Sequence, residues 1–249
     1  MKISEKTIRY LSTVILITVS LGLIFTSCKK KSNEEDKGED KATELVSQPE
    51  ATATENNKSG GVYKGVLTGS TGYVKIILQG GEKSVTVTMD GITKTLNEES
   101  FLPANWSSGQ AITQAKFSKD NWKVTFAVNA DGSNPIIVVE IPGHNNVAVA
   151  AMKEISTSLV RSFEGTVNYG DTIANSIFNF VVNGNSFSGT VRIAGETEIY
   201  SMSGTIQRDT TMQGTVNGAT VSGSIQGNNA SGTIVTPNTS AKWTAKRTL

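Results

Sequence analysis

Two side chains of this sequence have strong nucleophilic or metal-binding chemistry, and each type occurs once. Cys28 is the only cysteine and His144 the only histidine among 249 residues. One cysteine forms no intramolecular disulfide, and one residue of each type cannot build a His/Cys zinc site or a histidine-based triad from clustered motifs. His144 lies in the turn-like segment 142–146, so we expect it to be solvated.

The remaining composition argues against an enzyme and against nucleic-acid binding. Lys plus Arg is 23 and Asp plus Glu is 22, so no overall charge attracts a phosphate backbone. The sequence has no phosphate-binding loop, dinucleotide fingerprint or nucleophile elbow. We expect a non-enzymatic protein without cofactor or metal. A hydrolase of envelope glycans is the alternative, because two carboxylates distant in sequence can still meet in space.

The N-terminal residues have the features of a targeting signal. Lys2, Lys6 and Arg9 precede an apolar segment, residues 10–25. This segment is shorter than the about 20 residues that a membrane-spanning helix needs. A positive start followed by a short apolar segment is typical of a signal peptide, so we exclude it from the fold.

The apolar segment runs into the tetrapeptide Phe25-Thr26-Ser27-Cys28. This tetrapeptide resembles the lipobox of bacterial lipoproteins cut by signal peptidase II, with Phe25 in place of the usual leucine. The resemblance implies a signal peptide over residues 1–27 and a mature N-terminus at Cys28, carrying a diacylglyceryl thioether and an N-acyl chain such as palmitate. Each buried CH₂ contributes about 0.8 kcal/mol, so several chains give a stable membrane anchor. Lys29, rather than Asp, implies the outer membrane in diderm bacteria.

Residues 28–61 are predicted to be a disordered tether from the lipid. They are rich in charged and small residues and have almost no large apolar side chains, so they cannot offset their ordering entropy. Their coil span is on the order of 30 Å. The lysine- and acid-rich start is similar to the surface-export signals of Bacteroidota lipoproteins, although a merely solvated linker has the same composition.

From residue 62 onward, apolar and polar residues alternate with the period of a β-strand. The expected strands are 62–68, 73–79, 83–90, 92–96, 111–118, 122–129, 135–141, 147–155, 159–169, 176–183, 186–194, 197–207, 211–216, 219–226, 230–235 and 241–247. We therefore predict an all-β protein of antiparallel meanders that form small barrels or sandwiches. The expected domains are 62–157 and 158–249. A β-solenoid is a third option for the nearly even final spacings.

The second half repeats the phrase apolar–x–Gly–Thr/Ser–apolar. Its copies begin at Phe163, Phe187, Met202, Met212, Val221 and Ala230. Because side chains alternate across a strand, each glycine shares a face with the two apolar residues. Such glycines fit sharp curvature and tight packing in a narrow barrel, or a cleft in which a ligand approaches the backbone. Trp243 on the last strand is expected in the core.

The glycine phrases and the late tryptophan are similar in style to avidin-like, lipocalin-like and transferrin-binding-protein-type barrels. No ligand motif of those families matches, so the likeness implies no ligand. The two halves also resemble each other: Tyr63-Lys-Gly-Val-Leu67 matches Phe163-Glu-Gly-Thr-Val167, and a shift of 104 aligns residues 73–80 with 177–184. This similarity predicts two tandem related units, or arises by chance between period-two sequences.

Residues 97–110 interrupt the strand pattern for longer than any other segment after residue 62. This loop carries Glu98, Glu99, Phe101 and Trp106. Long loops on β scaffolds often bind partners, which makes these four residues a candidate binding site. The alternative is a plug, in which the apolar residues cover an open barrel end.

Taken together, these features predict a lipid-anchored envelope lipoprotein on the periplasmic or the outer side of the outer membrane. Its expected role is non-enzymatic, as a binding or structural module for an unknown envelope or extracellular partner. A small-ligand carrier with a site in a barrel mouth is the alternative within binding proteins.

Overall fold

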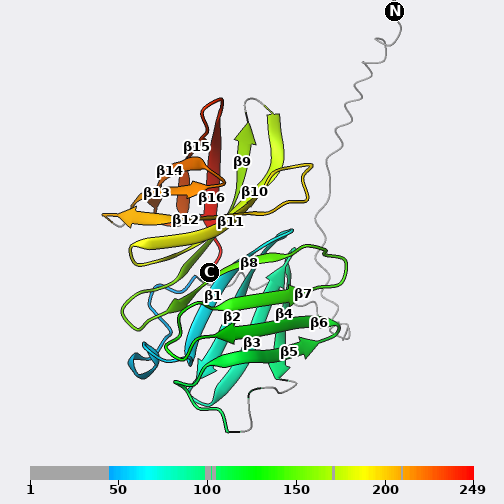
Figure 1. Ribbon diagram of the computed structural model, residues 1–249, viewed down its shortest axis with the longest axis vertical. Helices are drawn as coiled ribbons and strands as arrows, with labels where there is room; N and C mark the ends of the chain where they lie inside the picture. Colours follow the sequence, from blue (N-terminus) through cyan, green and yellow to red (C-terminus); the bar gives the residue numbers. More distant parts are fainter. Residues whose placement is uncertain (1–44, 99–101, 103–104, 170–171, 209) are drawn as a thin grey trace, which may run out of the picture. The chain divides into compact units, whose positions relative to one another are not determined.

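The described strands form two antiparallel sheets (Figure 1). This computed structural model describes residues 45–98, 102, 105–169, 172–208 and 210–249, so the predictions for Cys28, Glu99 and Phe101 lie outside the described residues. The only helix in these ranges is the 3-10 helix η1 (Ala53–Glu55). None of the described helical structure is long and apolar enough to cross a membrane. The prediction of an all-β fold is confirmed.

The first sheet contains eight strands. They are β1 (Gly61–Thr68), β2 (Thr71–Gln79), β3 (Glu82–Met89), β4 (Ile92–Glu98), β5 (Ile112–Lys119), β6 (Trp122–Val128), β7 (Ile136–Glu140) and β8 (Ala148–Glu154). Strands β1 to β7 pair with their neighbours along the chain, and β8 returns to pair with β1. Strands β7 and β8 are in contact but unpaired, so this sheet does not close.

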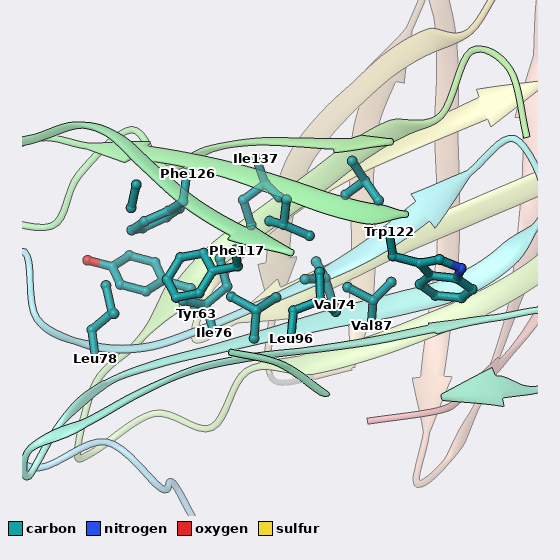
Figure 2. Close-up of a cluster of buried hydrophobic side chains, with 14 of the residues drawn as sticks. Tyr63, Val74, Ile76, Leu78, Val87, Leu96, Phe117, Trp122, Phe126 and Ile137 are labelled. Carbon is teal, nitrogen blue, oxygen red and sulfur yellow. The ribbon is translucent and has the colours of Figure 1, made fainter. Parts of the chain in front are cut away.

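The alternating apolar residues of this sheet point into one shared core. Figure 2 shows Tyr63 and Ile76, from β1 and β2, among side chains from β5 to β7 such as Phe126 and Ile137. The ring centroids of Tyr63 and Phe126 lie 4.9 Å apart. Aromatic pairs at this separation add stability beyond the area they bury.

The second sheet is a closed eight-stranded barrel (Figure 1, yellow-green to red). Its strands are β9 (Arg161–Tyr169), β10 (Thr172–Asn183), β11 (Ser186–Arg192), β12 (Tyr200–Gln207), β13 (Thr211–Val216), β14 (Ala219–Gln226), β15 (Asn229–Val235) and β16 (Ser240–Arg247). Strand β16 pairs with β9 and closes the barrel. The barrel prediction is therefore confirmed for this half, and the solenoid alternative is wrong.

The glycines of the repeated phrase make room for aromatic rings inside the barrel. Trp243 is 1% exposed and stacks on Phe178, with ring centroids 4.6 Å apart. Its indole covers Gly223 and Gly232, which face each other across β14 and β15. A Cβ on Gly232 would lie 2.7 Å from Cζ2 of this ring. Trp243 is therefore a core residue, as the sequence predicts.

The ring of Phe187 packs over a second pair of glycines in the same way. Gly204 and Gly214 face each other across β12 and β13. A Cβ on either residue would lie 2.5 or 2.6 Å from atoms of the Phe187 ring. These contacts support the packing interpretation of the glycine phrase over the ligand-cleft interpretation, because aromatic rings occupy the space that the glycines leave.

The resemblance between the two halves extends to their strand registers. Two pairs of facing residues in the first sheet, Tyr63–Ile76 and Val74–Val87, have counterparts in the barrel. Adding 100 to the number of Tyr63 and 104 to the other three numbers gives Phe163–Phe180 and Phe178–Val191, which also face each other. In both sheets the last strand also returns to pair with the first. Shared registers and shared connectivity are what a duplicated unit produces, and they favour the tandem-unit prediction.

Residues 46–60 pack against the first sheet, and we call them the N-terminal strap. Ala51 and Ser59 are buried, and the hydroxyl of Tyr63 donates a hydrogen bond to the carbonyl oxygen of Ser59 over 2.8 Å. The ordered chain therefore begins well before residue 61, where the sequence placed the end of a disordered tether. The strap has few apolar residues and is held by polar contacts, so its composition does not predict an ordered segment.

The two sheets belong to one compact unit, Ala42–Leu249. The side-chain amide of Asn179 donates to the carbonyl oxygen of Leu67 over 2.7 Å, and that of Asn183 donates to the carbonyl oxygen of Lys153 over 2.6 Å. A small apolar cluster of Val66, Ala150, Val160 and Val181 contains residues from both sheets and their connection. The predicted boundary at residues 157 and 158 falls between β8 and β9.

Candidate functional site

A buried ionic network brings together the strap and the first sheet. The ammonium of Lys64 lies 2.7 Å from Glu154 and 2.8 Å from Glu50. The side chains of Lys64 and Glu154 are fully buried, and Glu50 also pairs with Lys75. Burial alone would raise the pKa of Glu50, but the hydrogen bonds and charges of Lys64 and Lys75 outweigh it and lower this pKa.

The carboxylates of Glu50 and Glu154 are close enough to suggest glycosidase chemistry, but their environment is structural. Glu154 accepts hydrogen bonds from the backbone N–H groups of Glu50 and Val160 over 2.6 and 2.9 Å, in addition to the bond from Lys64. Lys64 contacts both carboxylates, where a sugar ring and a catalytic water would have to lie. This arrangement favours a role in stability over one in catalysis.

The described part of the predicted binding loop contributes to packing. Leu102 is buried in the core of the first sheet, and Trp106 packs against the same core. The indole N–H of Trp106 donates to the carbonyl oxygen of Gln110 over 3.1 Å. Glu98 ends β4 and pairs with Phe117 through the backbone. These positions favour the plug interpretation, and a binding role for the loop stays a prediction.

His144 is partly buried beside an acidic residue, where the sequence predicts a solvated turn. Its Nε2 atom lies 3.5 Å from a carboxylate oxygen of Asp90, and its side chain is 25% exposed. Asp90 also accepts a hydrogen bond from the hydroxyl of Ser70. Across the described ranges, no group of three or more His, Cys, Asp or Glu residues is arranged to hold a metal ion.

The mouth of the barrel contains a small apolar pocket. The pocket has a volume of about 120 Å³. Its apolar walls are Val191, Ile193, Tyr200, Val216, Ala219 and Ile234. Sites for whole small molecules usually enclose about 300–1,000 Å³, so this pocket is too small for such a ligand. It therefore disfavours a carrier of drug-sized molecules.

Two carboxylates flank the phenol that borders this pocket. The hydroxyl oxygen of Tyr200 lies 3.2 Å from Oε2 of Glu196 and 3.0 Å from Oε2 of Glu198. The hydrogen bond to Glu198, with smaller contributions from burial and the charges of both carboxylates, raises the pKa of Tyr200 to about 12. We call Tyr200, Glu196, Glu198 and the adjacent pocket the mouth site.

Sequence reasoning missed the mouth site. The three polar residues follow one another at every second position, which places them on one side of an extended chain. The sequence assigned residues 197–207 to a strand, whereas β12 begins at Tyr200. The two glutamates therefore lie on the connection before the strand, where they meet the phenol of Tyr200.

A larger surface depression lies over strands β5 to β7. It has a volume of about 400 Å³, and Lys116, Lys123 and Glu140 lie along it. The neighbouring outward residues of β7, Ile136 and Val138, are 60% and 52% exposed. Strand β7 is an edge of the first sheet, so this surface combines unpaired backbone groups with exposed apolar side chains.

The comparisons with known proteins identify no family. No protein-family model and no curated protein matches this chain. One solved structure, described as "Crystal Structure of Surface Lipoprotein", is similar at 13% sequence identity and a TM-score of 0.29, covering 75% of this chain and 98% of that chain. A TM-score this low supports no conclusion about this chain. Its all-β fold class is based on its own strands and closed barrel.

Proposed function

We propose that this protein is a lipid-anchored lipoprotein of the bacterial outer membrane that acts as a non-enzymatic binding or structural module. The observation that carries the proposal is the single cysteine, Cys28, at the end of a lipobox-like tetrapeptide. The tetrapeptide follows a positively charged and apolar segment, in the order that a lipoprotein signal requires.

The interior of the protein supports a binding or structural role. Aromatic rings over paired glycines fill the barrel, and the pocket at its mouth is small. The buried carboxylate of Glu154 and the partly buried carboxylate of Glu50 both pair with Lys64, and Glu50 also pairs with Lys75. These features favour recognition at the surface over enclosure of a ligand or hydrolysis of a glycan.

Metabolic labelling with radioactive palmitate tests the anchor. We expect the wild-type chain to incorporate label and the Cys28→Ser variant to remain unlabelled and uncut by signal peptidase II. Ser27→Ala is the matched control, because it retains a small residue before the cysteine and should be labelled like the wild type. Labelling of Cys28→Ser at the wild-type level would contradict the proposal.

Membrane fractionation tests the location. Because Lys29 follows the cysteine, we expect the lipidated chain in the outer-membrane fraction. Digestion of intact cells with a protease then distinguishes a chain exposed at the cell surface from one that faces the periplasm. Retention of the chain in the inner membrane would contradict the inference from Lys29.

A further inference from the structure

The N-terminal strap lies on the first sheet in the manner of a bound peptide. None of residues 46–60 belongs to a strand, and none forms a backbone hydrogen bond with the backbone of a described strand. Among these residues only Ala51, Ser59 and Gly60 are buried. A segment with so few buried side chains opens at a lower free-energy cost than the sheet beneath it.

Side chains of the sheet bind the main chain of the strap. Oε1 of Glu154 accepts hydrogen bonds from the backbone N–H groups of Glu50 and Ala51 over 2.6 and 3.3 Å. The side-chain amide of Gln79 donates to the carbonyl oxygen of Glu50 over 2.8 Å and accepts from the N–H of Thr52 over 3.1 Å. Every residue except proline offers both backbone groups, so these contacts would also hold an extended segment of another sequence.

One side chain of the strap is recognised by its charge. The carboxylate of Glu50 pairs with Lys75 and lies 2.8 Å from the ammonium of Lys64. The side chains of Lys64 and Glu154 are fully buried, so two buried charged groups face the strap. The next strap residue, Ala51, is 8% exposed, and a larger side chain there would have to displace its neighbours. This surface therefore selects an acidic residue followed by a small one.

We propose that the surface beneath the strap is a binding groove for an extended segment of a partner polypeptide, and that the strap is its intramolecular competitor. We call the surface formed by Lys64, Lys75, Gln79 and Glu154 the strap groove. The partner segment carries an acidic residue followed by a small one, so it reproduces the contacts of the strap. The two lysines and the strap seated between them favour such a segment over a basic or an apolar one.

Competition with the strap determines how strongly a partner binds. The strap is joined directly to β1, so its effective concentration at the strap groove is on the order of millimolar. A partner binds only to the fraction of molecules in which the strap is open, so weakening the strap raises the apparent affinity of the partner. This inference deepens the proposed binding role and does not depend on lipid attachment at Cys28, which palmitate labelling tests separately.

Peptide titration of the full chain in detergent micelles tests the proposal. The probe is a synthetic peptide of residues 46–60 with a C-terminal fluorophore, and its fluorescence anisotropy reports binding. We expect saturable binding to the Glu50→Gln chain, about tenfold or more tighter than to the wild-type chain, because this change weakens the competing strap. Glu82→Gln, at an exposed position of β3, is the control and should bind the probe like the wild type. The absence of saturable binding to the Glu50→Gln chain would overturn the proposal.

Changes in the probe test which of its residues are recognised. Probes with Glu50→Gln or Ala51→Leu should each bind the Glu50→Gln chain about tenfold more weakly than the unchanged probe, because they lose the carboxylate or the small side chain. A probe with Ser47→Ala is the matched control, since Ser47 is exposed, and it should bind like the unchanged probe. Equal binding of the Glu50→Gln probe would overturn the proposal.

A change in the strap groove locates the bound probe. In the Glu50→Gln chain, adding Lys75→Gln removes a cation of the groove and should weaken probe binding about tenfold. Adding Lys123→Gln, on β6, should leave binding unchanged. Equal effects of the two lysine changes would overturn the placement.

The oligomeric state of the wild-type chain identifies the occupant of the strap groove. Sedimentation in detergent micelles should show a monomer, because each strap occupies the groove of its own chain. A dimer that Glu50→Gln abolishes would instead identify the occupant as the strap of a second copy, and would overturn the proposal of a different partner.

Discussion

Trp243 occupies the space that a side chain on Gly223 would need. The Cζ2 atom of its indole would overlap a Cβ built on this glycine, and the ring stacks on Phe178 with the centroids 4.6 Å apart. The indole N–H also donates to the carbonyl oxygen of Ser222 over 3.2 Å. The ring therefore cannot move aside without losing both contacts.

Gly223→Ala is expected to lower the free energy of unfolding by about 1–3 kcal/mol, because it overpacks the barrel core. Urea denaturation measures this change. Thr220→Val, an exposed and nearly isosteric change on the same strand, should stay within about 0.5 kcal/mol of the wild type. Adding Trp243→Phe should relieve part of the Gly223→Ala defect, so strict additivity of the two changes would contradict the proposed overlap.

Lys64→Met is expected to destabilise the protein by about 3–5 kcal/mol, because it leaves the buried charge of Glu154 without its cation. Chemical denaturation at neutral pH provides the measurement. Lys123→Met is the matched control: its partner Glu140 lies 3.6 Å away and both side chains are largely exposed, so the loss should be below about 1 kcal/mol. Similar effects of the two changes would show that burial does not strengthen the first pair.

Glu164 is expected to make the protein less stable as the pH rises. Burial raises its pKa in the folded state, with a smaller contribution from the charge of Asp90. The folded state therefore binds a proton more tightly than the unfolded state, in which the pKa is about 4.3. Stability falls as pH rises from that value through the raised pKa.

Glu164→Gln removes this dependence, so at neutral pH the variant should be more stable than the wild type. Denaturation curves recorded between acidic and neutral pH test the difference between the two proteins. Glu82→Gln, at an exposed position, serves as the control. A constant difference between Glu164→Gln and the wild type across this range would contradict the assignment.

The strap is expected to loosen in acid. The pKa of Glu50 is lowered in the folded state, so the contribution of this carboxylate is present above the unfolded value of about 4.3 and is lost as pH falls through the lowered pKa. Hydrogen exchange at the backbone N–H of Thr52, which donates to the side chain of Gln79, reports on the strap. Glu50→Gln should show faster exchange at neutral pH, and unchanged protection would contradict this role.

Much of the strand pattern was predictable because alternation and turn residues act locally. Each of the sixteen expected strands overlaps one of the sixteen described strands. The turn dipeptide Asp90-Gly91 has φ angles of 50° and 79°, and Asn217-Gly218 has 43° and 78°. Glycine, asparagine and aspartate adopt such angles with little strain, so the sequence alone locates these turns.

The contacts between distant segments were not predictable from local patterns. Lysine is seldom fully buried, yet the side chain of Lys64 is buried beside Glu50 and Glu154, on the same face of β1 as two valines. These acids lie 104 residues apart in sequence. The glutamates of the mouth site lie in an irregular connection whose path no periodic pattern specifies.

The strap also determines how a pulling force would enter the folded chain. A guanidinium N–H of Arg247, at the end of β16, donates to the carbonyl oxygen of Val46 over 2.5 Å, while Glu50 is held by Lys64 on β1. Tension from the proposed lipid anchor would reach the last strand of the barrel and the first strand of the other sheet through separate contacts. Because Val46 precedes Glu50 in the chain, tension would load the contact with the barrel before the ion pair with β1.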